Sequence, residues 1–559
     1  MEAESLRRAY AGRHVLVTGC TGFVGKVWLA MALDRLPEIG RIYVLARRKR
    51  QQTALQRFEN IVSTSPVFGP LHEKHGPALG EFLGRRVEVV AGDISEPNLG
   101  LDPAVADRLV RDLDLVVNCA GLVDFTPGVD EAIATNATGA LHALTFVQRC
   151  RRAALLHIST CFVCGNRSGL IPETLTRDYC PKGLPFDAEA EYADVLKAVE
   201  RIHAWEHTPE AEEAATQEAM KRIHGRGRDD HNARLVRNMV DRGRRMRTKH
   251  DLIQEGMDRA RRWGWTNTYT YSKSLAESLL LARANETRMS VLRPAVVESA
   301  VSFPLAGWNE GFNTTAPLIY LLGTWFRHLP ADPKVPFDVV PVDLVCNGMT
   351  IAGAALMQGR HAPVYHCGTS DRNPLKLGRA TELTTLGKRK HLRKNGAGAL
   401  EKHLLSRWDC VTVDDDTFFS VANMRDWCRR TGEFLRSQRC PQWLRDSLDD
   451  FAHRMEKAVR ELDQVEGALE IFRPFIHDNR PIFTARAFDA FPVAEEEFRF
   501  RPEDLDWRTY WIDVHMPGLR HWCFPKLEGK ELKPDRPSIP FRLLPPPTPA
   551  REPAAATGS

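Results

Sequence analysis

The sequence predicts an α/β protein built on a doubly wound parallel sheet, with a helical insertion and a second, mostly helical unit behind it. Two observations lead to this prediction. Short apolar runs alternate with stretches of helical pattern over the first part of the chain. The first apolar run also turns on glycines directly into a helical stretch. Parallel strands need crossover connections, which helices supply, so this alternation favours a parallel sheet.

The predicted strands follow one another along the chain. The first begins at Val15, and the next four cover residues 41–46, 87–91, 113–119 and 154–158. They are almost entirely apolar, which is typical of strands that are covered by helices on both faces. Further strand-like runs follow at 289–292 and 335–340.

Composition divides the chain into parts. Residues 10–375 form the predicted sheet domain, which carries a charged helical insertion at about 181–262. Residues 376–530 form the mostly helical unit. The proline-rich tail, 531–559, is predicted to be extended or disordered, without a catalytic role.

The insertion is strongly basic. Residues 221–262 contain 14 Lys and Arg against 6 Asp and Glu. Charge runs are usually exposed helical faces, and this is the favoured interpretation. A flank for an acidic ligand, such as the phosphates of coenzyme A or an acidic carrier protein, is the second interpretation, and an anionic membrane surface is the third.

The overall composition excludes several classes of protein. Of the 559 residues, 43% are hydrophobic and 27% are charged, which is incompatible with wholesale disorder. A formal charge of +5 is too small to indicate nucleic-acid binding, and 12 cysteines are too few for a disulfide scaffold. Neither a secretory signal nor an apolar run of 18 residues is present. We therefore expect a cytoplasmic enzyme with reduced thiols.

Gly19, Gly22 and Gly25 form the pattern G-x-x-G-x-x-G directly after the first strand and before a helix. A side chain at these positions would keep backbone amides away from a pyrophosphate group, and the start of the helix supplies partial positive charge. The pattern therefore predicts a dinucleotide-binding turn.

The end of the second strand indicates which dinucleotide binds. An Asp or Glu there would bond the ribose 2′-hydroxyl, but this strand is followed by Arg47, Arg48, Lys49 and Arg50. Arginine binds phosphate through two hydrogen bonds, so the sequence predicts NADPH rather than NADH. A solvated basic turn is the alternative interpretation.

Two further strand ends carry candidate cofactor residues. Asp93 and Ile94 follow the third strand, where an Asp can accept a hydrogen bond from the adenine amino group. Asn118, Cys119, Ala120 and Gly121 close the fourth strand, where small residues would let the chain run beside the cofactor. Simple turn chemistry is the alternative for both.

Tyr269 and Lys273 are four residues apart, so on a helix they share one face. A free tyrosine, with a pKa of about 10, is a poor acid–base catalyst near neutrality, and a nearby ammonium favours the phenolate. We therefore expect Lys273 to lower the pKa of Tyr269 and to hold the nicotinamide ribose. Tyr271 competes for the role, but its partner at this spacing is the uncharged Leu275.

Ser159 and Thr160 follow the fifth strand, at the edge where doubly wound sheets place their sites. Thr160 is the first candidate for a hydroxyl that polarises a substrate carbonyl, and Ser159 is the second. Cys161 and Cys164 form C-x-x-C, but no second pair with metal-ligand spacing follows, so no metal is predicted.

Together these motifs resemble the extended short-chain dehydrogenase/reductases, and more narrowly the alcohol-forming fatty acyl-CoA reductases, particularly the bacterial type. The resemblance covers residues 10–375 strongly and about 470–525 weakly. It is carried by the segments 18–26, 42–47, 159–163, 267–273, 292–299, 307–311, 338–345 and 506–510.

The resemblance implies roles for individual residues. Gly19, Thr21, Gly22, Phe23 and Gly25 would line the pyrophosphate site, with Thr18 and Val24 beside them. Arg47 and Arg48 would hold the 2′-phosphate, Asp93 and Ile94 would flank adenine, and Pro294 and Val296 would border the nicotinamide. Tyr269 and Lys273 would be catalytic, with Thr160 or Ser159 polarising the carbonyl.

The resemblance also implies an activity: NADPH-dependent reduction of a long-chain acyl-CoA thioester to a fatty alcohol, through an aldehyde and with release of coenzyme A. Alternatives are a reductase that releases the aldehyde, a dehydrogenase acting on hydroxyls or ketones, and a non-catalytic dinucleotide sensor. Delivery by acyl carrier protein, the preferred acyl chain length and the oligomeric state are left open. A long-chain fatty alcohol is strongly apolar, which favours transient peripheral membrane contact.

A long acyl chain needs an apolar trough, which we expect between the carboxyl edge of the sheet and the helical region after residue 375. Its candidate wall residues are Phe312, Leu318, Leu321, Trp325 and Phe326. Ordinary core packing is the alternative for these side chains.

Overall fold

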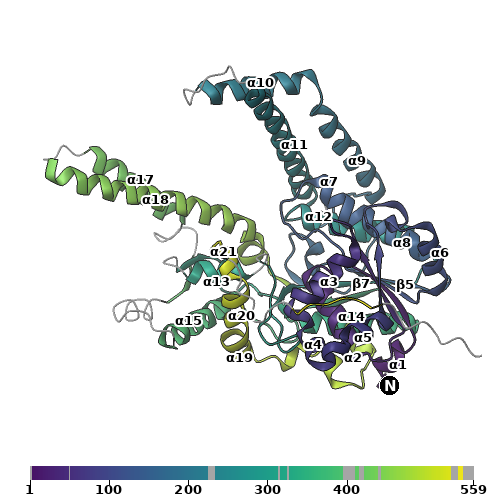
Figure 1. Cartoon of the computed structure of the whole chain (residues 1–559). Helices are drawn as coiled ribbons and strands as arrows, with labels where there is room; N and C mark the ends of the chain where they lie inside the picture. The colour runs from purple at the N-terminus through teal and green to yellow at the C-terminus, as the bar shows by residue number, and fades with distance from the viewer. Residues whose placement is uncertain are drawn as a thin grey trace, which may run out of the picture.

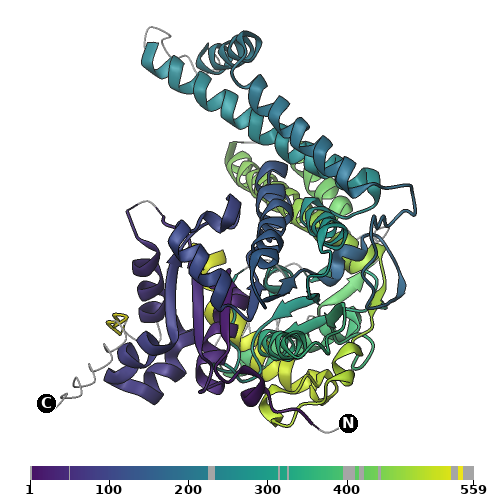
Figure 2. The ribbon, with the colours of Figure 1, turned by 90° about the vertical axis from the view of Figure 1, so that its right-hand side faces the viewer.

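A seven-stranded parallel sheet forms the centre of the molecule (Figures 1 and 2). The computed structural model describes residues 3–49, 51–224, 233–311, 315–323, 327–394, 409–413, 421–437, 442–530 and 539–544. The strands of the sheet are β1 (His14–Thr18), β2 (Arg41–Ala46), β3 (Val87–Ala91), β4 (Leu115–Asn118), β5 (Ala154–Ile158), β7 (Met289–Pro294) and β11 (Val364–Cys367). Their order is β11-β7-β5-β4-β1-β2-β3, so the doubly wound parallel fold is confirmed.

One strand prediction was only partly right, and one strand was missed. The run at 335–340 does not extend the central sheet: only β10 (Val339–Pro341) is a strand, and it pairs with β8 (Val296–Glu298). Pro336 lacks a backbone N–H and interrupts the run before it can pair as a central strand. The edge strand β11 was not predicted, because its four residues include His366 and give no apolar run.

Helices cover both faces of the sheet. One layer contains α2 (Phe23–Arg35), α3 (Ala54–Thr64), α4 (Gly69–His75), α5 (Leu79–Arg86) and α14 (Val342–Met357). The other contains α6 (Pro103–Asp112), α8 (Gly139–Arg149) and α12 (Thr268–Arg283). Shorter helices are α1 (Leu6–Tyr10), α7 (Val129–Ala132), α13 (Thr315–Gly323), α19 (Trp507–Thr509), α20 (Met516–Trp522) and α21 (Phe524–Leu527).

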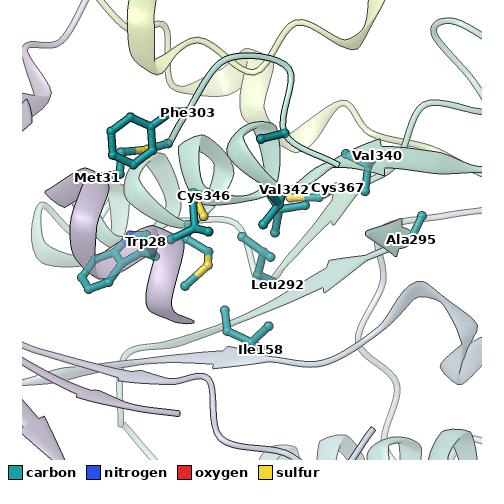
Figure 3. Packing of buried hydrophobic residues seen from close by; sticks show 14 of the residues in the cluster. Trp28, Met31, Ile158, Leu292, Ala295, Phe303, Val340, Val342, Cys346 and Cys367 are labelled. Atoms are coloured by element: carbon teal, nitrogen blue, oxygen red, sulfur yellow. The ribbon is translucent and has the colours of Figure 1, made fainter. Parts of the chain in front are cut away.

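The first layer packs α2 and α14 against the sheet. Figure 3 shows Trp28 and Met31 of α2 beside Cys346 of α14, with Ile158 and Leu292 of the sheet below them. All five side chains are buried in one continuous apolar cluster. Because α2 begins at the glycine turn, this packing fixes the position of the turn relative to the strand ends.

Two helical arms project from this body (Figure 1). The predicted insertion forms the first arm, with α9 (Ala188–Trp205), α10 (Pro209–His224) and α11 (Ala233–Trp263). The second is a hairpin of α17 (Val421–Ser437) and α18 (Gln442–Arg473), whose last turns return to the body. No helix in the described ranges is long and apolar enough to cross a membrane.

The C-terminal part of the chain packs onto the sheet domain instead of standing apart. Phe488, Trp511 and Leu519 belong to the same apolar cluster as α2 and α14. Two small parallel pairs add to this: β13 (Pro481–Phe483) with β6 (Gly169–Ile171), and β12 (Val411–Val413) with β9 (His328–Pro330). The helix α15 (Leu377–Lys394) precedes the second arm.

Candidate active site

The glycine turn lies at the carboxyl end of β1. Gly19 has φ +74°, and a Cβ there would lie 2.6 Å from the backbone carbon of Cys119. A Cβ on Gly25 would lie 2.5 Å from the carbonyl oxygen of Gly19. The turn therefore requires glycine at both positions. It leaves the first amides of α2, which begins at Phe23, directed at the pocket beside it.

Most of the predicted site residues meet in one cavity of about 290 Å³. They come from the turn after β1, the ends of β4, β5 and β7, and the first turns of α12. They are Gly19, Gly22, Phe23, Val24, Gly25, Cys119, Gly121, Ser159, Thr160, Tyr269, Lys273, Pro294 and Val296.

The helix α12 brings Tyr269 and Lys273 into this cavity. It starts at Thr268, where Asn267 caps it by accepting a hydrogen bond from the backbone N–H of Thr270 at 2.9 Å. The Lys273 ammonium donates to the carbonyl of Ile158, 2.9 Å away at the end of β5. The catalytic lysine candidate is therefore tied to the strand that carries Ser159 and Thr160.

The expected acidification of Tyr269 by Lys273 is not found in the structure. Burial raises the pKa of Tyr269 to about 12, and the Thr160 side chain opposes that shift. Burial also lowers the pKa of Lys273 to about 8, against the opposing influence of Cys119 and Glu277. Desolvation thus disfavours the charged form of both groups.

Thr160 and Ser159 differ in their hydrogen bonding. The Thr160 hydroxyl accepts from the backbone N–H of Phe162 at 3.3 Å and donates to the carbonyl of Pro294 at 3.4 Å. The Ser159 hydroxyl is buried and has no partner among the described residues. A buried hydroxyl without a partner is costly, so Ser159 is a donor available to a bound molecule.

Asn136 is a buried residue of this region that the sequence did not reveal. It lies in a turn of π-helix, η4 (Ile133–Thr138). Its side chain accepts a hydrogen bond from the N–H of Leu122 at 2.8 Å and donates one to the C=O of Leu122 at 3.1 Å. It also donates to the Ser272 hydroxyl at 2.9 Å. The sequence around Asn136 has an ordinary helical pattern. Only the structure shows the π-helical turn, a feature that often lies at functional sites.

Thr18 and Asn118 lie behind the cavity instead of in its wall. The Thr18 hydroxyl donates to the side-chain oxygen of Asn118 at 2.8 Å and accepts from the N–H of Ala120 at 3.0 Å. The Asn118 amide in turn contacts a ring nitrogen of His157 at 3.1 Å. These bonds join the ends of β1, β4 and β5.

A second cavity of about 500 Å³ adjoins the first along the glycine turn. Its lining contains four cationic side chains, one carboxylate and several hydroxyl and amide groups. Its polar lining comprises Thr21, Lys26, Lys49, Gln52, Arg57, Asn60, Thr64, Ser65, Asn309, Glu310 and Lys526. Such a lining suits phosphate groups. Of these residues, only Thr21 was among the predicted site.

The remaining adenosine-side predictions lie outside both cavities. The Arg47 side chain is exposed and faces Asp93 at 3.6 Å, while Arg48 is exposed. Asp93 also accepts from the N–H and hydroxyl of Ser95, at 3.0 and 2.6 Å. Ile94 is buried in the core of the opposite layer.

The far half of the first cavity is apolar. Phe475 stacks on Phe125 with ring centres 5.7 Å apart and meets Phe162 edge-on at 5.0 Å. Phe337 and Phe472 complete the aromatic wall. Two of these five rings come from residues after 375.

The predicted trough wall is found only in part. Leu318 lines the cavity, and Leu321 packs partly buried against the core. Phe312, Trp325 and Phe326 lie outside the described residues. The aromatic wall itself was missed, because its residues are scattered from 125 to 475 and share no local pattern.

The cysteines near the site are thiols. Cys161 and Cys164 are buried, and burial raises the pKa of both, that of Cys164 to about 12. Burial also raises the pKa of Cys119, in the cavity wall, to about 11. Among the residues that the structure describes, no group of three or more His, Cys, Asp or Glu is arranged to hold a metal ion.

These features fit a dinucleotide. The turn is free of side chains where a pyrophosphate would approach, Ser159 has an unused hydroxyl, and Lys273 reaches the same cavity. Cations line the neighbouring cavity at the end where an adenosine phosphate would lie.

Comparisons with known proteins agree with this geometry. The family model described as male sterility protein matches residues 17–349. An alcohol-forming fatty acyl-CoA reductase of Simmondsia chinensis is 25% identical over 535 residues, covering 93% of this chain and 98% of that protein. Fatty acyl-CoA reductase 8 of Arabidopsis thaliana is 26% identical over 523 residues, covering 90% and 96%. Fatty acyl-CoA reductase 1 of Gallus gallus is 26% identical over 375 residues, covering 66% and 60%.

A solved structure shows the same fold. The terminal R domain from the myxalamid PKS-NRPS biosynthetic pathway superposes with a TM-score of 0.51. It is 16% identical in sequence, and the match covers 92% of each chain.

Proposed function

Because the chain belongs to the male sterility protein family, whose model spans residues 17–349, we propose that it is an alcohol-forming fatty acyl-CoA reductase that uses NADPH. The relatives and the family model place the chain among oxidoreductases of the fatty acyl-CoA reductase group, with a dinucleotide-binding domain. The relatives named above are plant and animal proteins, so the bacterial subtype stays a prediction from the motifs.

One observation carries the proposal. A single cavity joins a side-chain-free glycine turn, the polar trio of Thr160, Tyr269 and Lys273, and an aromatic wall. A dinucleotide fits the first, a reacting carbonyl fits the second, and an acyl chain fits the third. The polar trio adjoins the aromatic wall, since the ring centres of Tyr269 and Phe125 are 6.3 Å apart.

The chain's residues have distinct roles in this reaction. NADPH, when bound, supplies the hydride that reduces the acyl carbonyl. Tyr269 and the hydroxyl of Thr160 or Ser159 donate hydrogen bonds to the carbonyl oxygen as it becomes negative, when preorganised donors help most. Thr160 would exchange its 3.4 Å bond to the Pro294 carbonyl for this one, whereas Ser159 has no other partner among the described residues. Tyr269 then gives its proton to that oxygen, and Lys273 holds the positive charge that stabilises the resulting phenolate. Collapse of the hemithioacetal releases coenzyme A and leaves an aldehyde.

Retention of the aldehyde in the aromatic half of the cavity supports a second reduction to the alcohol. Phe475 packs there against both Phe125 and Phe162, and these rings would exclude water from the chain of the bound aldehyde. An aldehyde is a better electrophile than the thioester, so the second reduction at the same polar trio is chemically easier than the first.

Selection of NADPH over NADH rests on charge. The end of β2 carries Arg47 and Arg48 and no acid, and the neighbouring cavity adds Lys49 and Arg57. Cations of this kind bind a 2′-phosphate, whereas NADH offers none. The acyl carrier protein as donor, the cytoplasmic location and peripheral membrane contact stay predictions from the sequence.

The experiment that tests the proposal is product analysis by gas chromatography after incubation of the protein with palmitoyl-CoA and NADPH. We expect hexadecanol, with two NADPH consumed for each coenzyme A thiol released. One NADPH per thiol, with hexadecanal as product, would show an aldehyde-releasing reductase. Absence of thiol release would exclude both, and would leave a dehydrogenase of hydroxyls or ketones to be tested with those substrates.

A further inference from the structure

The segment 307–311, which we call the bridging segment, joins the start of α2 to the C-terminal helices. On the α2 side, the Glu310 carboxylate accepts two hydrogen bonds from the Lys26 ammonium, at 2.7 and 3.0 Å. The Trp308 ring also packs on the ring of Phe23, with centres 5.1 Å apart. Phe23 is the first residue of α2 and Lys26 the fourth, so both contacts are made within one turn of the dinucleotide-binding helix.

On the other side, the bridging segment lies directly on α20. A Cβ placed on Gly518 would be 1.9 Å from the carbonyl oxygen of Gly307, so the two backbones touch. The Asn309 amide donates to Glu298 at 2.9 Å and to Ser299 at 3.1 Å. The bridging segment is thus fixed from both sides.

The position of Glu310 has an electrostatic consequence. Asn309 and Glu310 line both cavities, beside Gly22 and Phe23 at the start of α2. The bound pyrophosphate would lie there, and a carboxylate close to an anion is unfavourable. The Lys26 side chain is 6% exposed and directed at Glu310, whose side chain is 37% exposed. Lys26 therefore cancels a negative charge that would otherwise face the cofactor.

We propose that Lys26 neutralises Glu310 through their ion pair, so that the carboxylate of the bridging segment does not repel the phosphates of the incoming dinucleotide. This inference rests on the dinucleotide binding of the proposed function and adds to it an electrostatic role for two residues. Neither residue is assigned a part in the chemistry of the carbonyl.

The proposal predicts an asymmetry between the two partners. Removing Lys26 leaves an unpaired carboxylate beside the pyrophosphate site. Removing Glu310 leaves an ammonium there, which an anion tolerates. Removing both side chains also removes the repulsion between the Glu310 carboxylate and the pyrophosphate, so cofactor binding should recover. A salt bridge that only stabilises the fold predicts no such rescue of cofactor binding by the second substitution.

The test compares the wild type with Lys26→Met, Glu310→Gln, the double variant and Lys26→Arg. Dissociation constants for NADPH and NADP⁺ are measured by calorimetry, and melting temperatures are measured in parallel. We expect Lys26→Met to weaken binding at least about tenfold, and the other three variants to stay within about threefold of wild type. The matched control is Lys74→Met with Asp34→Asn, a pair 2.8 Å apart that involves the opposite end of α2.

Two results would overturn the inference: Lys26→Met binding the dinucleotide as wild type does, or the double variant binding as weakly as Lys26→Met. Loss of binding that follows the melting temperature in every variant, control included, would also overturn it. Failure of the proposed function looks different, because the wild type would then bind the dinucleotide and not reduce palmitoyl-CoA. A wild type that binds no dinucleotide would refute both.

Discussion

The side-chain amide of Asn136 donates to the hydroxyl of Ser272, 2.9 Å away, and so joins a π-helical turn to the residue before Lys273. The same amide fixes Leu122, and a Cβ on the neighbouring Gly121 would lie 2.9 Å from the Lys273 ammonium. Asn136 therefore holds together the two segments that enclose Lys273.

Substituting Asn136→Ala should lower kcat by roughly tenfold to hundredfold, because the Leu122 segment and Lys273 lose their common anchor. It should also cost about 1–3 kcal/mol of unfolding free energy, because buried polar groups lose their partner. Steady-state kinetics and urea unfolding measure the two effects. The control is Asn347→Ala, a buried amide that bonds the carbonyl of Arg499 outside the cavity. It should reduce stability and leave kcat unchanged; equal kcat values in both variants would contradict the role of Asn136.

Substituting Tyr269→Phe should reduce turnover of palmitoyl-CoA by about 10²–10⁴-fold while NADPH binding persists, because only the proton donor is lost. NADPH oxidation and cofactor-induced fluorescence quenching measure the two properties. Tyr271→Phe is the matched control on the same helix, since its hydroxyl donates to Glu191 at 2.7 Å, outside the cavity. Turnover by Tyr269→Phe at the level of Tyr271→Phe would refute the assignment.

Lys273 should make the stability of the free protein depend on pH. Burial lowers its pKa from 10.5 to about 8, so between these values the unfolded chain holds a proton that the folded chain has lost. The free energy of unfolding should therefore rise with pH across this window, by roughly 3 kcal/mol from this group. Comparing denaturant unfolding of the wild type and Lys273→Met from pH 7 to 10.5 isolates the effect. Parallel curves would show that Lys273 has an ordinary pKa.

The double variant Arg47→Ala/Arg48→Ala should raise the KM for NADPH about tenfold and leave the KM for NADH unchanged, because a phosphate contact is worth more than about 1 kcal/mol. The ratio of kcat/KM for the two cofactors is the measurement. Arg85→Ala removes an exposed arginine paired within α5 and serves as the control. Equal use of both cofactors by the wild type would contradict the NADPH assignment.

Substituting Phe475→Ala should lower kcat/KM for palmitoyl-CoA far more than for octanoyl-CoA, because the longer chain buries more apolar surface, at about 0.8 kcal/mol per methylene. Phe434→Ala is the control, since that ring is 62% exposed on α17. A uniform loss for both chain lengths would place Phe475 outside the acyl site.

The central fold could be predicted because its signals are local. The glycine turn, the apolar strands and the Tyr269–Lys273 spacing are each visible within a few residues, and the structure places them at one edge of the sheet. The short strand β11 and the broken run at 335–340 lacked such a signal, since pairing partners decide whether three or four residues form a strand.

The rest of the site depends on distant contacts. The aromatic wall unites Phe125, Phe162 and Phe475, which no sequence spacing relates. The cations of the second cavity come from α2, α3 and α21 as well as from the segment after β2, so Arg57 was missed although Lys49 was noticed. The sequence predicted a lowered pKa for Tyr269, whereas burial raises it. Desolvation of this kind depends on the packed surroundings, which the sequence does not show.

The buried cysteines around the cavity have a practical consequence for assays. A thiolate, not a thiol, attacks thiol-specific reagents, and burial raises the pKa values of Cys119, Cys161 and Cys164. Coenzyme A liberated by the reaction is a free thiol in solution and reacts with a chromogenic disulfide at once. Product release can therefore be followed continuously with such a reagent, against a blank that contains the protein and the reagent without substrate.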